Sequence, residues 1–170
     1  MTKTTHDSET HAQGQQVITA CALIHHTFEG VTKVFIAERA ATKKFLPGAH
    51  EIPGGHIDYG ESIVAGLQRE IREEFEVDIR VGDPFAAFDY MNPIKGSHSV
   101  EIIYFATLLG SPDDIVIHPE DHASGKWISR AELPTIMSEK KDTDDPEYRA
   151  LQKAFDLLEG GSVDFARTDP

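Results

Sequence analysis

Residues 54–77 read GGHIDYGESIVAGLQREIREEFEV, and they join a glycine pair, a short polar loop and a proline-free run rich in carboxylates. In the second half of this stretch, apolar side chains recur every fourth residue, at Ile63, Leu67, Ile71 and Phe75. Apolar side chains at this spacing form one stripe along a helix. We therefore predict an amphipathic helix over residues 62–75 that packs on a core.

Three glutamates border the apolar stripe of the predicted helix. They are Glu70, Glu73 and Glu74, at positions i, i+3 and i+4, so they project from one side of the helix. Clustered carboxylates repel one another unless a cation relieves the repulsion. Oxygen ligands without a cysteine or a paired histidine favour Mg²⁺ or Mn²⁺ over zinc. The pattern predicts a Mg²⁺ site, with Mn²⁺ as the alternative, and Gly66 on the same side is expected to leave room for a bulky ligand.

The spacing of the fixed residues in this stretch resembles a known motif. Gly55 is followed after five residues by Glu61, and after seven more by the run REIREEFEV at residues 69–77. This resembles the Nudix box, G-x5-E-x7-R-E-U-x-E-E-x-G-U, in which U is aliphatic. One fixed position differs, because Glu76 stands where the pattern has glycine. The residue after a helix often adopts the left-handed conformation, so we expect a glutamate there to cost about 1 kcal/mol and to alter the following loop.

The resemblance implies a fold and an activity. The implied fold is α/β, a Nudix-type α/β/α sandwich with a mixed β-sheet between helices. The implied activity is Mg²⁺-dependent hydrolysis of the diphosphate bond in a nucleoside triphosphate, a modified nucleotide or a compound of the ADP-ribose type. The implied metal ligands are Glu70, Glu73, Glu74 and the backbone of Gly54. Gly55 is expected to contact the substrate, while Glu61 and Arg69 support the loop and the helix.

A carboxylate is expected to take the proton of the attacking water. The candidates for this catalytic role are Glu73, Glu74 and Glu120. Glu120 is included because many family members supply a further acid just before a tryptophan-containing strand, and Glu120 precedes Trp127 by seven residues. Asp121 is the second choice. His118 and His122 flank these acids, so a zinc site is the alternative, although no third zinc-type ligand is nearby in the sequence.

Further polar residues lie at the ends of predicted strands or in loops. In the family, the first strand pair often lines the base pocket. The resemblance therefore makes four polar residues of this pair candidates for substrate contacts: His25, His26, Glu38 and Arg39. We retain Arg39 as a substrate-binding residue; the alternative for each is an ordinary polar residue at a strand end. Lys43 and Lys44 could meet phosphate, and Glu101 faces either solvent or the metal.

The composition limits the partners. The 170 residues suffice for one domain, and 16 basic against 29 acidic residues give a net charge of −13. This charge repels phosphate backbones, so we expect a small-molecule nucleotide substrate and no nucleic acid polymer. A single cysteine, Cys21, indicates a reducing compartment. Because the sequence lacks a run of about 20 apolar residues and an apolar signal region, we predict a cytoplasmic protein with no membrane partner.

We divide the chain into a disordered lead (residues 1–15), a Nudix domain (16–160) and a flexible tail (161–170). Strands are predicted at residues 17–25, 31–38, 50–52, 77–81, 85–90, 100–109, 115–117 and 125–128. Helices are predicted at residues 130–136, where Ser129 and Glu132 form a capping box, and from Pro146 to residue 158. The apolar face of the last helix could serve the core or a homodimer.

Two other classes of function stay open at this stage. One is a nucleotide-binding Nudix module without catalysis, against which the intact glutamates argue. The other is a protein like an isoprenoid-diphosphate isomerase, which needs a catalytic cysteine, whereas this chain has Cys21 alone. Pro93, sixteen residues past Val77, occupies a place where ADP-ribose hydrolases of the family tend to have proline. This proline alone does not decide whether the substrate is ADP-ribose, a dinucleotide, a nucleoside triphosphate or a nucleotide sugar.

Overall fold

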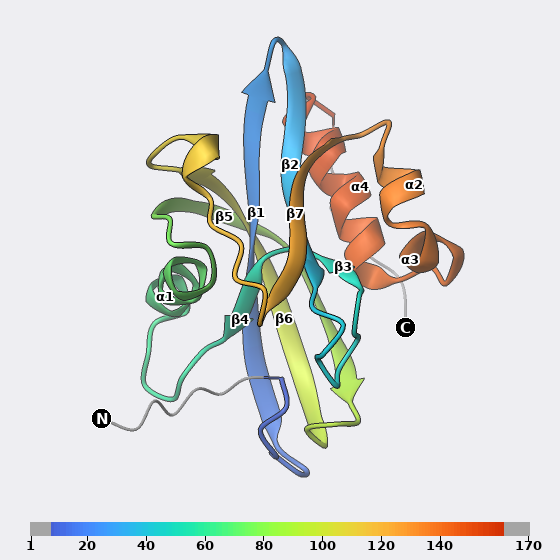
Figure 1. Cartoon of the computed structure of the whole chain (residues 1–170). Helices are drawn as coiled ribbons and strands as arrows, with labels where there is room; N and C mark the ends of the chain where they lie inside the picture. The colour runs from blue at the N-terminus through green and yellow to red at the C-terminus, as the bar shows by residue number, and fades with distance from the viewer. Residues whose placement is uncertain (1–7, 162–170) are drawn as a thin grey trace.

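The computed structural model describes residues 8–161, which form a mixed sheet between helices (Figure 1). The strands are β1 (Gln16–Phe28), β2 (Val31–Arg39), β3 (His50–Glu51), β4 (Gly54–His56), β5 (Ile79–Asn92), β6 (Ser97–Leu108) and β7 (His122–Ser129). The main path of the sheet runs β3-β2-β1-β6-β5, while β4 pairs with β1 and β7 with β2. Strands β1 and β6 are parallel, and the other pairs are antiparallel.

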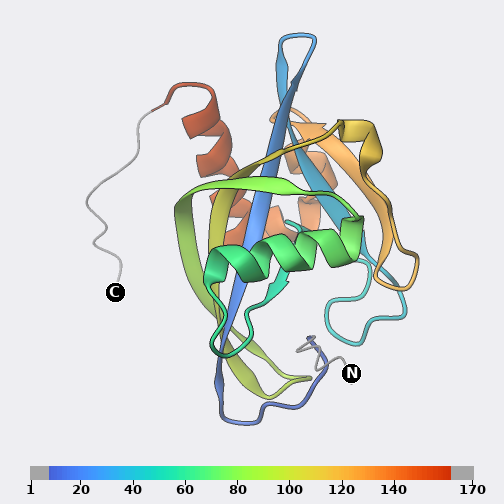
Figure 2. The ribbon, with the colours of Figure 1, turned by 90° about the vertical axis from the view of Figure 1, so that its left-hand side faces the viewer.

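Helices cover both faces of this sheet. They are α1 (Ile63–Phe75), α2 (Leu133–Ile136), α3 (Ser138–Asp142) and α4 (Pro146–Leu158), with a short 3₁₀ helix at Pro112–Asp114. Helix α1 lies on one side and α2 to α4 lie on the other (Figures 1 and 2). The predicted α/β/α sandwich is confirmed. None of the helices within residues 8–161 has the length and apolar character needed to cross a bilayer.

Two apolar clusters form because neighbouring residues of a strand point to opposite faces. Ala22 on β1 belongs to the cluster beneath α1, which includes Leu67. Leu23, the next residue along β1, belongs to the cluster beneath α4, which includes Leu151. All four side chains are fully buried. Strand β1 therefore joins the two halves of the core.

Helix α1 begins and ends as the sequence predicts. The Ser62 side chain accepts the backbone N–H of Ala65 at 3.2 Å and caps the first turn. At the other end Glu76 is left-handed, with φ 56° and ψ 24°, and its N–H donates to the Arg72 carbonyl oxygen. The Glu76 carboxylate also lies 3.0 Å from Nε2 of His118. The strained position expected for Glu76 is therefore present, and its side chain contacts the segment that leads to β7.

Three predictions in the second half of the sheet are wrong. Strand β5 is continuous instead of breaking at residues 82–84, because register shifts between Val81 and Ala86 absorb Pro84 on an edge strand. No strand forms at residues 115–117; there Val116 donates its N–H to the Phe75 carbonyl oxygen at 3.1 Å. Strand β7 begins at His122, three residues earlier than predicted.

The helices after β7 also differ from the prediction. Glu132 accepts hydrogen bonds from the N–H and hydroxyl of Ser129, both at 2.8 Å, but α2 begins only at Leu133. Helix α3 was not predicted. Helix α4 begins at Pro146 as expected, because Asp145 accepts the N–H of Glu147 at 2.8 Å.

Residues 8–15 make specific contacts, although the sequence predicted a disordered lead. Asn92 donates to the Ser8 carbonyl oxygen at 3.0 Å, and Ala12 donates its N–H to the Lys95 carbonyl oxygen at 2.8 Å. On another loop, the N–H of Lys44 donates to a Glu9 carboxylate oxygen at 2.6 Å. This segment therefore ties together residues 40–49 and 91–98. The rest of the predicted lead and nearly all of the predicted tail lie outside the described residues.

Candidate active site

A cavity of about 810 Å³ is lined by residues of α1, of the start of α4 and of several strands and loops. Its walls also come from β1, the last residue of β2, β3 to β6, the loops after β2 and β5, and the first residue of β7. The acidic side chains that line it are Glu51, Glu70, Glu73, Glu74, Asp89, Glu101, Asp121, Asp145 and Glu147. The basic side chains are Arg39, Lys43, Lys44, Lys140, with the imidazoles of His56 and His122. The fold therefore brings the predicted box carboxylates together with residues up to 77 positions away in the chain, the separation of Glu70 and Glu147.

Arg69 connects the loop before α1 to the helix itself. Its guanidinium donates to both oxygens of Glu61 at 3.0 Å and to the His56 carbonyl oxygen at 3.0 Å. It also donates to Glu70 at 2.6 Å and lies 3.6 Å from Glu73. The Arg69 hydrogen bonds lower the pKa of the Glu61 carboxyl. Glu61 and Arg69 thus occupy the positions that a supporting role requires.

The glycine pair permits two close approaches that a side chain would block. A Cβ atom at Gly55 would collide with the Glu70 carboxylate, and one at Gly54 would collide with the backbone and thiol of Cys21. The expectation for Gly66 is wrong, because its open side is filled by Glu61 and Ile57 from the preceding loop, not by space for a ligand. The three glycines therefore allow residues 54–61 to pack closely against α1 and β1.

Glu74 and its surroundings form the most crowded charged region of the cavity. Burial, followed by the negative charges of Glu51, Glu70 and Asp121, raises the pKa of the Glu74 carboxyl well above its usual value. Burial likewise raises the pKa of Glu70, although Arg69 opposes the change. A cation at this place would relieve both carboxyl groups.

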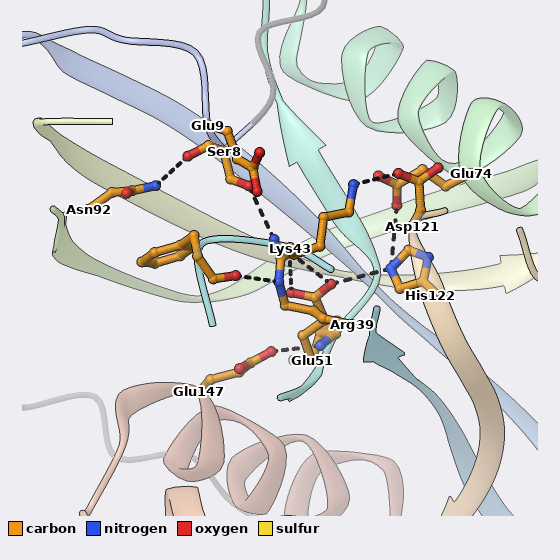
Figure 3. Close-up of polar contacts among 12 residues, drawn as sticks. Ser8, Glu9, Arg39, Lys43, Glu51, Glu74, Asn92, Asp121, His122 and Glu147 are labelled. Atoms are coloured by element: carbon orange, nitrogen blue, oxygen red, sulfur yellow. Dashed lines mark hydrogen bonds and ion pairs between the residues drawn. The ribbon is translucent and has the colours of Figure 1, made fainter. Parts of the chain in front are cut away.

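A chain of polar contacts leads from Glu74 to the opposite wall (Figure 3). The buried His122 ring places Nε2 3.9 Å from Glu74 and 3.3 Å from Glu51, and it stacks on Phe75 with ring centroids 4.8 Å apart. Arg39 donates to both Glu51 oxygens at 3.1 and 3.2 Å. Burial opposes ionisation of Glu51, but these partners outweigh it and lower the Glu51 pKa. Glu51 is therefore an ionised link beside the box carboxylates, and sequence reasoning missed it.

The acid contributed by the loop before β7 is Asp121. Its carboxylate lines the cavity and binds Nζ of Lys43 at 2.6 Å. Glu120 is exposed and does not line the cavity, so the prediction that placed it at the site is wrong. Lys43 and Lys44 both line the cavity, as does Arg39. Pro93 is also on the lining.

Other sequence candidates lie elsewhere. His25 and His26 pair with Val34 and Lys33 in the outer part of the β1–β2 hairpin, outside the cavity lining. Glu38 accepts the Ser124 hydroxyl at 2.7 Å and is also outside the lining. The Trp127 ring packs against Phe35 with centroids 5.5 Å apart and belongs with the core beneath α1. These residues are structural contacts of the hairpin and the core.

Glu101 faces the cavity and not bulk solvent. Burial raises the pKa of its carboxyl to about 7, and the thiol of Cys21 is its hydrogen-bond partner. Lys140 on α3 and Glu147 on α4 line the same region and form an ion pair. The sequence signal for Glu101 was a single acid within an apolar strand, whereas Lys140 and Glu147 lie on helices with no local signal of a site.

The donor set fits a hard divalent cation. It consists of carboxylate oxygens from α1, enclosed by protein and close enough to raise one another's pKa. Among residues 8–161, no three histidine, cysteine or acidic side chains already stand close enough to hold an ion together. Glu70 is instead occupied by Arg69.

Comparison with known proteins identifies the family. The sequence matches the family model of the NUDIX domain over residues 17–152. The chain belongs to the Nudix family. The resemblance drawn from residues 55–77 is confirmed, and it extends over most of this Nudix protein.

Two curated relatives illustrate the range of the family. The chain is 27% identical over 123 residues to the NAD-capped RNA hydrolase NudC of Stutzerimonas stutzeri, covering 69% of this chain but only 42% of that longer protein. It is 30% identical over 128 residues to a putative 8-oxo-dGTP diphosphatase 2 of Mycobacterium tuberculosis, covering 71% of this chain and 78% of the relative. These names are those of hydrolases of nucleotide derivatives, in agreement with the enzyme class predicted for this Nudix protein.

A solved structure shares the fold. The MutT protein from Methanosarcina mazei Go1 superposes with a TM-score of 0.66 at 17% sequence identity, over 88% of this chain and 99% of the other. At this identity the similarity concerns the fold alone. It supports the sandwich architecture of this Nudix protein.

Proposed function

We propose that this Nudix protein is a Mg²⁺-dependent hydrolase that cleaves the diphosphate bond of a small nucleoside diphosphate derivative. The observation that carries the proposal is the gathering of Glu70, Glu73, Glu74 and Asp121 on one cavity, where burial and mutual repulsion raise the Glu74 pKa. Such repulsion favours a bound cation. Cation binding next to a cavity of this size suits a phosphorylated small molecule.

The residues of α1 would hold the cation through Glu70, Glu73 and Glu74, with the Gly54 backbone as a further oxygen ligand. When bound, Mg²⁺ or Mn²⁺ would neutralise phosphate oxygens and lower the pKa of a bound water. Arg69 keeps Glu70 and Glu73 aligned until the cation binds.

Three basic side chains on the cavity wall would meet the phosphates that are not held by the cation. They are Arg39, Lys43 and Lys44. Arg39 is fixed by Glu51 and by the Phe45 carbonyl oxygen at 2.9 Å, so its guanidinium is already oriented. Gly55 lets the Glu70 carboxylate approach the backbone before α1, and its contact with the substrate stays a prediction.

The proton of the attacking water would pass to a carboxylate of the cavity. We assign this role to Glu73, Glu74 or Asp121, because Glu120 is exposed outside the lining. In the metal-free site, burial followed by the charges of neighbouring carboxylates raises the Glu74 pKa, and a raised pKa makes a carboxylate a stronger base. The products would be a nucleoside monophosphate and a second phosphorylated fragment or pyrophosphate.

The choice among nucleoside triphosphates, modified nucleotides and ADP-ribose compounds belongs to experiment. The exclusion of nucleic acid polymers stays a prediction, because one relative is named as a hydrolase of NAD-capped RNA. The cytoplasmic location and the homodimer also stay predictions.

The proposal is tested by incubating the purified full chain with nucleoside triphosphates, ADP-ribose and dinucleoside polyphosphates, with Mg²⁺ or with EDTA. We expect Mg²⁺-dependent release of a nucleoside monophosphate from at least one of them, measured by anion-exchange chromatography. Glu73→Gln and Glu74→Gln should each lower kcat/KM by at least about 100-fold, more than the loss of an outer-shell partner costs.

Asp113→Asn is the matched control, because Asp113 is an exposed acid outside the cavity and should leave kcat/KM unchanged. Calorimetry should detect Mg²⁺ binding to the wild type and a much weaker binding to both glutamine variants. Hydrolysis that proceeds equally in EDTA, or that survives both glutamine substitutions, would contradict the assigned metal site.

A further inference from the structure

The polar side chains of the cavity form two groups. The outer group surrounds Glu74, whose carboxyl is influenced by Glu51, Glu70, Asp121 and Lys43. The inner group surrounds Glu101, which is influenced by Cys21, Lys140, Glu51 and Asp145. Glu51 is the member that both sets share. The proposed metal site accounts for the outer group, and the inner group needs a separate explanation.

The inner group offers hydrogen-bond acceptors to a ligand. Glu147 is already bound to Lys140 and to the backbone N–H of Ile52 at 2.6 Å, and Asp145 caps α4. Glu101 has only the thiol of Cys21, a weak donor, as its described hydrogen-bond partner. The Glu101 carboxylate therefore keeps acceptor capacity directed at the cavity, while Lys140 keeps ammonium protons that Glu147 does not use.

Flat aromatic side chains stand next to Glu101. Phe88 of β5 pairs directly with Glu101, and Tyr90 lies two pairs further along the ladder, opposite Ser99. Because side chains alternate along a strand, Phe88 and Tyr90 are on the same face of the sheet as Glu101. The Tyr90 ring is stacked with Phe45 at a centroid distance of 6.0 Å and an interplanar angle of 12°. All three rings line the cavity. Aromatic faces of this kind bind nucleobases by stacking, whatever the base.

The acceptors determine which base edge fits. An ionised carboxylate can only accept hydrogen bonds. Guanine presents two adjacent donors, N1–H and the 2-amino group, beside the O6 acceptor. Adenine and cytosine present one amino group beside a ring nitrogen that accepts, and uracil presents one N–H between two carbonyl groups. Only guanine-type bases offer a carboxylate two parallel N–H donors, and Lys140 can donate to O6.

We propose that the inner end of the cavity selects a guanine-type base, with Glu101 as the specificity-determining residue that accepts the N1–H and 2-amino protons. The inference rests on the proposed function, because it assigns the nucleoside part of the same substrate. A base stacked on Tyr90 and held by Glu101 would leave its phosphates directed past Glu51 toward Arg39 and the box carboxylates.

The test measures the affinity of GMP, IMP and AMP for the full chain by calorimetry in EDTA at pH 8.5, where Glu101 is ionised. The three ligands share ribose and phosphate, so differences report the base. GMP should bind about 10- to 100-fold more tightly than AMP, and IMP, which lacks the 2-amino group, should fall between them. GMP binding no tighter than AMP, or no detectable GMP binding, would overturn the proposal.

Two variants sharpen the assignment. Glu101→Gln replaces one acceptor by a donor. The affinity for GMP should therefore fall about 10-fold or more, while the affinity for AMP stays the same or rises. Asp83→Asn removes an exposed acid of β5 outside the cavity and should leave all three affinities unchanged. If Glu101→Gln does not fold, as judged by its thermal unfolding, the comparison of GMP, IMP and AMP on the wild type still decides whether the cavity selects a guanine-type base.

The two proposals fail in different ways. Mg²⁺-dependent hydrolysis that ignores the base would leave the proposed function intact and remove the role of Glu101. Selective binding of GMP without turnover of any guanine nucleotide would leave base selection intact and remove the proposed function.

Discussion

Replacing Glu101 by glutamine should change how the stability of the metal-free protein depends on pH. The Glu101 pKa is about 7 in the folded protein against 4.5 for the free side chain. A raised carboxyl pKa means that folding favours the protonated form, so its stabilisation is complete below about pH 4.5 and is lost as the pH rises through 7. At about 1.4 kcal/mol for each pH unit, the loss reaches roughly 3 kcal/mol.

The measurement is urea unfolding of the wild type and Glu101→Gln in EDTA, at several values between pH 5 and pH 8.5. Glu70 and Glu74 titrate in both proteins, so the difference between the two free energies of unfolding isolates Glu101. We expect the variant to gain up to roughly 3 kcal/mol relative to the wild type across this range, and Asp83→Asn to gain nothing. A difference that stays constant with pH, or that shifts in favour of the wild type as pH rises, would refute the reasoning.

Three further substitutions or deletions test other parts of the structure. Gly55→Ala places a Cβ against Glu70, so calorimetry should show Mg²⁺ affinity lowered by at least about 10-fold; unchanged affinity would mean that the close approach is unimportant. Glu76→Gly removes about 1 kcal/mol of left-handed strain but loosens the unfolded chain by a similar amount and loses the His118 contact, so thermal unfolding should change little; a large shift in either direction would argue against this balance. Deleting residues 1–10 releases the loops on both sides of the cavity, which should raise KM several-fold with little change in kcat; a selective fall in kcat would speak against it.

The parts of the fold that the sequence predicted correctly are those with local signals. Helix α1 carries its own apolar stripe and its own cap at Ser62, and α4 begins at an aspartate followed by proline. The predicted break of strand β5 at Pro84 was wrong. Whether an edge strand can accommodate a proline through register shifts depends on its pairing with β6, which the local sequence does not show. Only half of the predicted capping box forms, because Glu132 accepts hydrogen bonds from Ser129 but the Ser129 hydroxyl donates and does not accept; α2 begins late, with Pro134 in its first turn.

The candidate site divides in the same way. The box glutamates and Arg69 lie within one short stretch, so their spacing alone brought them together. Glu120 and Asp121 are neighbours, and a shift of one residue before a strand reverses the direction of a side chain; the sequence does not fix that register. The sequence shows Glu101 as a lone acid in an apolar strand, but not which way its side chain faces. The structure pairs Glu101 with Phe88 and places both on the cavity lining.

The contacts of Ser8 and Glu9 have a practical consequence for work with this protein. An affinity tag fused at the amino end would enter beside the loops that wall the cavity, and could alter binding of nucleotides without touching any catalytic group. Helix α4 starts at the cavity, but its thirteen residues carry the chain roughly 20 Å along the helix axis before it ends at Leu158. The end of α4 at Leu158 is therefore a better point from which to extend the chain with a purification handle than the segment at Ser8 and Glu9, which contacts the cavity loops.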